Sequence, residues 1–220
     1  MLLFALLGLG TSVCAVANAD SAGCTAELQN INNAFTHSLN IGADLNWKNV
    51  EGLRAAVEKK FSDHGPVGLR EVCYAFFTYR TALTKYRDCF GVLPLISTNG
   101  AATGVTRKQA YDYYILMAQI DYACGGGYEI FTNQDSCIAQ TFVTRKDDLK
   151  KCRYTFDDEN SADGQNLCMY FGKFIECYRD IFRNCNEEAA FFGCEYARVG
   201  LHFHYQQCSD KFCFVNHKFT

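Results

Sequence analysis

The chain has 220 residues, a formal net charge of −3 and 15% aromatic residues. The aromatic content excludes an intrinsically disordered chain, and the slightly acidic balance disfavours a nucleic-acid binder, which carries a basic excess or a basic face. The length suffices for one domain with a substantial hydrophobic core.

Residues 1–19 predict a secretory signal peptide. Met1 to Gly10 is apolar and uncharged, and Ala17-Asn18-Ala19 forms a small-x-small cleavage site before Asp20. A charged segment before the apolar run is missing, and the alternative is a buried N-terminal helix. The apolar run falls short of the roughly 20 residues that a membrane span needs. We therefore expect a signal peptide over 1–19 and a single secreted, extracellular domain over 20–220, with no membrane span.

The cysteines predict a disulfide framework. Of thirteen cysteines, Cys14 falls in the signal peptide, and the even number that remains is typical of a secreted protein with up to six bridges. The alternative is free thiols or a zinc site. Only Cys208 and Cys213 have the spacing of a zinc knuckle, and no second half accompanies them. We expect no metal and no cofactor.

The first half of the chain predicts three helices with apolar residues at helical spacing. The first spans about 24–40, the second follows Asn46 and ends at His64-Gly65-Pro66, and the third continues to Phe90. Their predicted buried faces are Leu28, Ile31 and Phe35; Val50, Leu53, Val57 and Phe61; and Leu69, Val72, Phe76, Tyr79, Leu83, Tyr86 and Phe90. The third set alternates steps of three and four, which is typical of a bundle seam.

After a loop over 91–105, a central helix is predicted. Thr106 and Gln109 have the spacing of a capping box. The helix runs to Tyr122 and is apolar on nearly every side, which indicates that other helices cover it all round. Gly125 to Gly127 then ends the helix as a C-cap. A phosphate-binding loop is the alternative, but no Lys-Ser/Thr follows the glycines.

The C-terminal part predicts helices over about 133–152, 165–184 and 187–207. The middle helix carries a seam of Cys168, Phe171, Ile175, Tyr178, Phe182 and Cys185, and Asn186 is a suitable N-cap for the last. The acidic stretch 157–164 predicts a solvated loop, because it lacks the Asp and Glu positions of a calcium-binding EF-hand. The whole is an all-α, disulfide-braced bundle of about six or seven helices.

Four disulfides are predicted from hairpin geometry, because facing residues of two antiparallel helices lie about equally far from the turn. The predicted pairs are Cys73–Cys124, Cys137–Cys185, Cys152–Cys168 and Cys177–Cys194. The hairpin of the second and third pairs is centred near residue 160. The geometry gives no partner for four cysteines: Cys24, Cys89, Cys208 and Cys213. It predicts how far along its helix each cysteine lies, but not whether its side chain points toward the partner helix.

Catalytic patterns are absent from the sequence. No G-x-S-x-G motif occurs, and His202 and His204 would point to opposite sides of a helix, one buried and one exposed. We therefore predict no catalytic, cofactor-binding or metal-binding residue and a protein that is not an enzyme. The aromatic residues are expected to fill the core, although they could also line an apolar cavity.

The cysteine spacing resembles that of a secreted nematode family, domain of unknown function nineteen. The resemblance rests on Cys73-x₁₅-Cys89, on Cys124-x₁₂-Cys137-x₁₄-Cys152 with Phe131 between them, and on Phe174-Ile175-Glu176-Cys177-Tyr178 leading to Cys185. It covers about residues 24 to 213. It implies a nematode origin and secretion, and no catalytic residue can be carried over.

Together these features predict a secreted, non-catalytic module that binds an unknown extracellular protein. The alternative function is a carrier that holds a lipid or small apolar ligand in a cavity between the aromatic-rich helices. A contiguous internal apolar pocket of several hundred Å³ would favour the carrier, whereas a solid core with an exposed apolar patch would favour the interaction module.

Overall fold

The computed structural model describes residues 21–63, 66–89, 92, 95–96 and 105–215. This part of the chain holds nine α-helices and three 3₁₀-helices and contains no strand, so the predicted all-α, disulfide-braced fold is confirmed. The predicted signal peptide, residues 1–19, and Phe90 lie outside the described residues.

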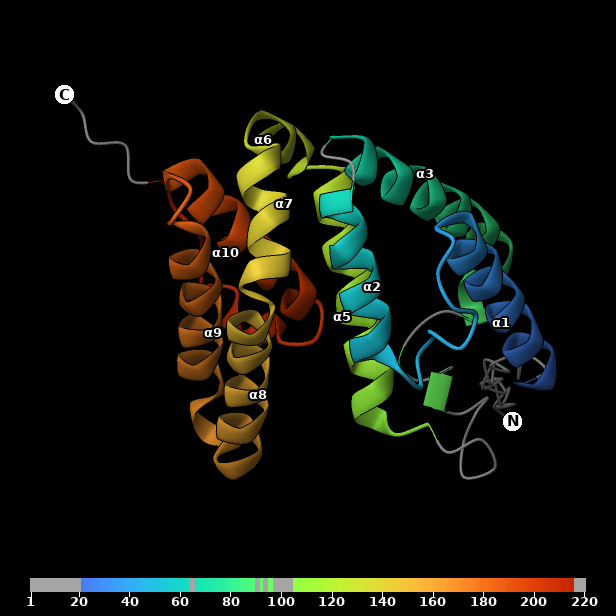
Figure 1. Ribbon diagram of the computed structural model, residues 1–220. Coiled ribbons are helices and arrows are strands. Elements are labelled where there is room, and N and C mark those ends of the chain that lie inside the picture. The colour runs from blue at the N-terminus through green and yellow to red at the C-terminus, as the bar shows by residue number, and fades with distance from the viewer. Residues whose placement is uncertain (1–20, 64–65, 90–91, 93–94, 97–104, 216–220) are drawn as a thin grey trace, which may run out of the picture.

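The N-terminal half comprises residues 21–124. Its elements are α1 (Ser21–Ser38), α2 (Val50–Asp63), α3 (Pro66–Leu83), η1 (Thr84–Cys89) and α5 (Arg107–Cys124). The helices α1 and α5 both pack on α3, and α2 lies over α5 (Figure 1).

The C-terminal half comprises residues 128–215. Its elements are α6 (Tyr128–Asn133), α7 (Asp135–Thr144), α8 (Lys146–Ala162), η2 (Gly164–Asn166), α9 (Leu167–Phe182), α10 (Glu187–His202) and η3 (Gln206–Cys208). In Figure 1 α8 and α9 form an antiparallel pair, and α10 packs on both α9 and α5.

Local sequence signals set several helix starts. The predicted capping box is present: Gln109 N donates to Thr106 Oγ1 at 3.1 Å, and Thr106 N donates to Gln109 Oε1 at 2.8 Å. Asn186 caps α10 by accepting from Ala189 N at 2.8 Å. The helix α5 ends at Cys124, and Gly125 is its C-cap, so the C-cap interpretation of the glycines is confirmed.

The two halves share one aromatic core. Phe142 of α7 lies at its centre, with ring centroids 5.3 Å from Phe61 of α2, 5.1 Å from Phe182 of α9 and 5.2 Å from Tyr196 of α10. All four side chains are buried. This ring cluster joins helices from both halves, so neither half buries its apolar face alone.

The predicted helix over 133–152 is wrong as one element. The chain leaves helical geometry at Gln134 and at Arg145, where φ is −121° and −112°. The predicted range therefore holds two helices, α7 and the first part of α8, and the short helix α6 precedes them. The predicted loop over 157–164 is also wrong, since α8 continues to Ala162 and only a short turn precedes α9. The described helices therefore outnumber the predicted six or seven.

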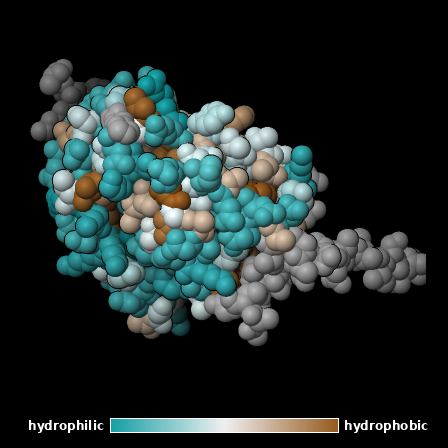
Figure 2. Space-filling view, turned by 45° about the vertical axis from the view of Figure 1, so that its right-hand side comes forward, coloured by the Kyte–Doolittle hydropathy of each residue, from teal (hydrophilic) through white to brown (hydrophobic). Residues whose placement is uncertain are grey.

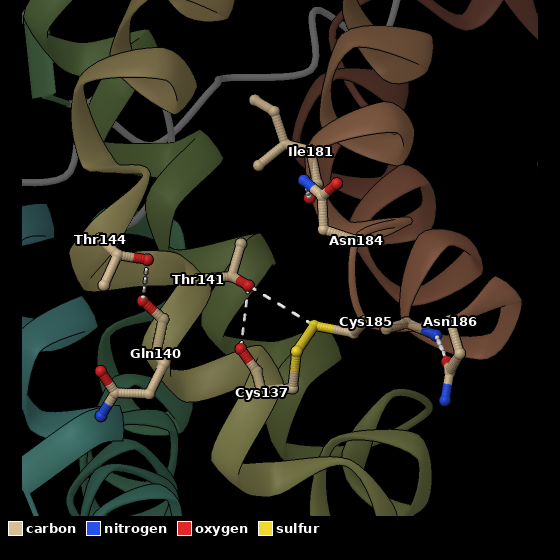
Figure 3. The surroundings of a disulfide bond; sticks show 9 residues. Cys137, Gln140, Thr141, Thr144, Ile181, Asn184, Cys185 and Asn186 are labelled. Carbon is tan, nitrogen blue, oxygen red and sulfur yellow. Dashed lines mark hydrogen bonds between the residues drawn. A yellow bond between two sulfur atoms is a disulfide. The ribbon is translucent and has the colours of Figure 1, made fainter.

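Six disulfides brace the bundle. They are Cys24–Cys89, Cys73–Cys124, Cys137–Cys185, Cys152–Cys177, Cys168–Cys208 and Cys194–Cys213. The predicted pairs Cys73–Cys124 and Cys137–Cys185 are confirmed. Figure 3 shows the second of these, where Thr141 of α7 donates to Cys137 O at 2.9 Å and lies 3.6 Å from Cys185 Sγ.

The predicted pair Cys152–Cys168 is wrong because the turn was placed too early. With the hairpin centred on the actual turn between α8 and α9, Cys152 lies as far before the end of α8 as Cys177 lies after the start of α9. These two cysteines are therefore at equal height and form the bridge. Cys168, next to the turn, instead bonds to Cys208 of η3.

The predicted pair Cys177–Cys194 is wrong for a different reason. The two residues lie at similar heights along their helices. The residue of α10 that faces α9 is Gly193 and not Cys194, because a Cβ at Gly193 would collide with the Phe182 ring of α9. Consecutive helical residues point about 100° apart, so Cys194 is turned away from α9. It bonds to Cys213 of the C-terminal segment, 19 residues later.

Candidate functional site

Among the described residues, the cysteines and histidines form no metal-binding group and leave no free thiol. Every cysteine of the described residues is in a disulfide. Across 21–215, within the described ranges, no three His, Cys, Asp or Glu side chains are grouped to hold a metal ion. The helices of the described part are too short or too polar to cross a membrane. The unusual chemistry of the molecule lies instead in polar groups buried between its helices.

Arg54 and Glu58 of α2 are charged residues in the interior. Their exposed fractions are 2% and 4%, and Arg54 Nη1 lies 3.7 Å from Glu58 Oε1. The same Nη1 donates to Oε1 of Gln119, which is fully buried on α5. Because removing a charge from water costs several kcal/mol, such residues persist in a core only when neighbouring groups compensate them.

Arg153 of α8 extends the network across the two halves. Its Nε and Nη2 donate to the two carboxylate oxygens of Glu51 on α2, at 3.1 and 2.7 Å. Its Nη1 donates to the hydroxyl of Tyr178 on α9 at 2.8 Å. A two-pronged contact of this kind fixes orientation as well as charge, so Arg153 sets how α8 meets α2.

Four buried polar atoms of this network make no hydrogen bond among the described residues. They are Arg54 Nε, Glu58 Oε1, Gln119 Nε2 and Tyr196 OH. Buried polar atoms are paired in the great majority of cases, and each exception requires a physical explanation. Here the exceptions gather around one pair of residues between α2, α5 and α10.

Burial and charge shift the two carboxylates of α2 in opposite directions. Burial raises the pKa of Glu58, and the nearby Arg54 only partly offsets this effect. Burial also acts to raise the pKa of Glu51, but the hydrogen bonds and charge of Arg153, with Arg54 and Lys150, outweigh it and lower that pKa. Glu51 is therefore held as a carboxylate, whereas Glu58 resists ionisation.

A cleft of about 650 Å³ opens beside this network. We call it the α2–α8 cleft; it is lined by Glu51, Gly52, Arg54, Ala55, Glu58, Lys59, Ser62, Asp63, Phe142, Val143, Lys146, Asp147, Lys150 and Arg153. Glu51, Arg54 and Arg153 also line a smaller pocket of about 170 Å³. The cleft is large enough for a small organic molecule.

A second feature is a set of exposed aromatic residues on the outer face of α3. Tyr74 and Phe77 are 74% and 69% exposed, and Val67 on the same helix is 40% exposed. Arg80, one turn after Phe77, lines a pocket of about 240 Å³ with Phe76, Tyr79, Leu83, Tyr114, Met117, Ala118, Asp121 and Phe203. Tyr74 and Phe77 do not line this pocket, but exposed aromatic residues are themselves typical of protein-binding surfaces.

His204 is the histidine with an unusual environment. Its ring contacts Tyr111 edge-on at 4.4 Å and Tyr114 at 5.2 Å, and its Nε2 is buried without a hydrogen bond. Burial lowers its pKa to about 4. The prediction of one buried and one exposed histidine is wrong, because His202 and His204 are both half-buried.

Sequence reasoning missed the buried network. The seam predicted for the second helix was Val50, Leu53, Val57 and Phe61, and these residues are buried. Arg54 and Glu58 each follow a seam residue and lie one turn apart, on the flank of the same face. An oppositely charged pair at that spacing beside a seam was the available signal, although such pairs usually lie in solvent.

The chain was compared with protein-family models, with curated proteins and with solved structures, and none of the three comparisons found a match. The resemblance to the nematode family therefore stays a hypothesis that rests on cysteine spacing alone.

Proposed function

We propose that the protein is a secreted, non-catalytic interaction module that binds another extracellular protein through the outer face of α3. Secretion is supported by the signal-like residues 1–19 and by six disulfides, which persist in oxidising compartments. The observation that carries the binding role is the exposure of Tyr74 and Phe77, side by side on one helix.

The rest of the surface supports a binding mode with few anchors. The face shown in Figure 2 is mostly hydrophilic, and its hydrophobic residues form small separate groups. Protein interfaces commonly take most of their binding energy from a few aromatic anchors within a polar rim. Tyr74 and Phe77 provide such anchors.

The alternative function, a carrier with an internal apolar cavity, has less support. The aromatic rings that could line such a cavity pack against one another around Phe142, with the centroid distances given above. The largest of the pockets described here, the α2–α8 cleft, has charged walls. The packed aromatic core and the exposed Val67, Tyr74 and Phe77 of α3 therefore support the interaction module more than the carrier.

The test is a binding screen of the purified, oxidised protein against a panel of purified extracellular domains by biolayer interferometry. We expect a saturable partner whose Kd rises at least about tenfold for Y74S/F77S, because each buried aromatic anchor contributes about 1–2 kcal/mol or more. The control Y154S/M169S removes exposed apolar area from α8 and α9 and should leave the Kd unchanged. The proposal is overturned if no domain binds or if Y74S/F77S binds as tightly as the wild type.

A further inference from the structure

The α2–α8 cleft combines an apolar floor with charged walls. Ala55 of α2, and Phe142 and Val143 of α7, contribute the apolar part. Phe142 is buried and anchored in the aromatic core, so this floor is rigid. An apolar ligand body could rest on it without rearrangement of the helices.

Most charges that line the cleft are already paired. Arg153 holds Glu51, Lys59 Nζ lies 2.6 Å from Asp63 Oδ1, and Arg54 lies beside Glu58. Lys146, Asp147 and Lys150 of α8 also line the cleft and make no ion pair among the described residues. Lys150 Nζ lies over the ring of Tyr154, 5.2 Å from its centroid, and its charge helps to lower the pKa of Glu51. The two lysines are four residues apart and share a face of α8. The unpaired charge in the cleft is therefore net positive.

The inner wall carries two buried polar atoms that make no hydrogen bond among the described residues, Arg54 Nε and Glu58 Oε1. Each faces an ion-pair partner at 3.7 Å, which is beyond hydrogen-bond distance: Arg54 Nε faces Glu51 Oε1, and Glu58 Oε1 faces Arg54 Nη1. A single hydroxyl group could accept from Arg54 Nε and donate to Glu58 Oε1. These atoms are a second observation, independent of the lysines, that points to a ligand.

We propose that the α2–α8 cleft binds an amphipathic organic carboxylate that also carries a hydroxyl group. The carboxylate lies between Lys146 and Lys150, the apolar body rests on Ala55, Phe142 and Val143, and the hydroxyl meets Arg54 and Glu58. This binding site is distinct from the face of α3 and does not depend on the proposed protein-binding function.

The ligand class is tested by isothermal titration calorimetry with straight-chain carboxylates of six to twelve carbons. Each is compared with its ω-hydroxylated counterpart and with an alkyltrimethylammonium of the same length. We expect one-to-one binding of carboxylates and none of the cations. At least one ω-hydroxy acid should bind more tightly than its unhydroxylated counterpart, because it pairs buried polar atoms. A hydroxyl that weakens binding at every length, or equal binding of the cations, overturns the proposal.

The location is tested with variants of the cleft. K146E/K150E should weaken binding at least about tenfold, since each charge-assisted hydrogen bond contributes about 1.5–3 kcal/mol. D147N should strengthen binding, and K85E, which alters an exposed lysine of η1, should leave the Kd unchanged. A55W fills the cleft from the exposed side of α2 and should abolish binding while the thermal unfolding midpoint stays near that of the wild type. Wild-type affinity in either K146E/K150E or A55W overturns the proposed site.

Discussion

At the scale of single residues, the molecule departs most from ordinary protein chemistry at Arg54 and Glu58. A charged pair in a core gives little net stability, because the desolvation of both charges offsets their attraction. Arg54 also donates to Gln119 of α5, and we infer from this contact that the pair selects one arrangement of α2 on α5. Hydrophobic packing alone tolerates several such arrangements.

The first prediction concerns this pair. R54M leaves the Glu58 carboxyl buried without its counter-charge, and we expect it to lower the free energy of unfolding by about 3–5 kcal/mol. The double variant R54M/E58L should recover most of that loss, since an apolar pair of similar volume needs no solvation. Urea unfolding of both variants measures the difference. K59M, which removes an exposed ion pair, should cost less than about 1 kcal/mol. A double variant no more stable than R54M would contradict this account.

The second prediction concerns His204, whose pKa burial lowers to about 4 from the ordinary value of 6.5. Between these values the unfolded chain binds a proton that the folded chain does not. The contribution of His204 to stability is therefore complete above about pH 6.5 and is lost as the pH falls toward 4. We expect about 1–2 kcal/mol for this half-exposed group.

The measurement is the difference in unfolding free energy between pH 7 and pH 4.5. Carboxylates contribute to the same trend, so the comparison with H204F isolates the histidine. H204F keeps an aromatic ring against Tyr111 and should show a smaller pH dependence than the wild type. H202F is the control for a nearby histidine. An unchanged pH dependence in H204F would refute the assignment.

At the scale of helices, α10 depends on glycine for its close contacts. A Cβ at Gly193 would overlap the Phe182 ring of α9, and a Cβ at Gly200 would lie 2.8 Å from Ile115 Cγ2 of α5. The helix therefore approaches α9 near its start and α5 near its end. Both contacts lie between packed helices, so they are decided by side-chain packing and not by helix propensity.

The third prediction follows from these contacts. G193A should destabilise the protein by about 1–3 kcal/mol, because the Phe182 ring must move within a packed core. The matched control is G172A in α9, where the nearest atom to a new Cβ is Lys211 Cδ at 3.8 Å. That change should stabilise by about 0.5–1 kcal/mol, as alanine does in an open helix. Chemical denaturation gives the change in the free energy of unfolding for both variants. If both changes have the same sign, Gly193 does not limit the packing of α10 on α9.

The hairpin of α8 and α9 shows how far helix geometry alone can predict a bridge. The rule that bonded cysteines lie equally far from the turn holds for Cys152 and Cys177 once the turn is placed between Ala162 and Leu167. The sequence-based turn was placed inside 157–164 because acidic residues there suggested a loop. Those residues instead form the last turns of α8, which are exposed to solvent. Polar residues occur both in exposed helix turns and in loops, so polarity alone does not distinguish the two.

At the scale of the whole molecule, each of the six disulfides lies within one half of the described structure. Cys24–Cys89 and Cys73–Cys124 lie within the N-terminal half, and the other four bridges lie within the C-terminal half. Non-covalent contacts hold the halves together, chiefly the aromatic core around Phe142 and the contact of Arg153 with Glu51. The α2–α8 cleft lies where the halves meet.

The fourth prediction is this bridge topology. Non-reduced peptide mapping should find Cys152 linked to Cys177 and no linked peptides that join residues before Gly125 to residues after Gly127. Alkylation of the unfolded, unreduced protein should label none of the twelve bridged cysteines. A peptide that joins Cys152 to Cys168, or any bridge between the halves, would contradict the structure.

The loops closed by these bridges predict how much each contributes to stability. The Cys24–Cys89 bridge spans 65 residues and the Cys194–Cys213 bridge spans 19. By the chain-entropy estimate, C24S/C89S should cost about 4 kcal/mol and C194S/C213S about 3 kcal/mol.

The sequence by itself determined the helical class, most helix positions, the capping box at Thr106, the N-cap at Asn186 and two of the six bridges. Most of these features depend on residues close together in the chain or on the period of apolar side chains, and such signals are local. The two bridges, whose cysteines are 51 and 48 residues apart, follow from equal distances to a hairpin turn. The tertiary structure alone decided which side of each helix faces which neighbour. That choice set the remaining bridges, buried Arg54 and Glu58 beside Gln119 and created the cleft between α2 and α8. Each of these features depends on how the helices are turned and packed against one another, and no local pattern encodes those contacts.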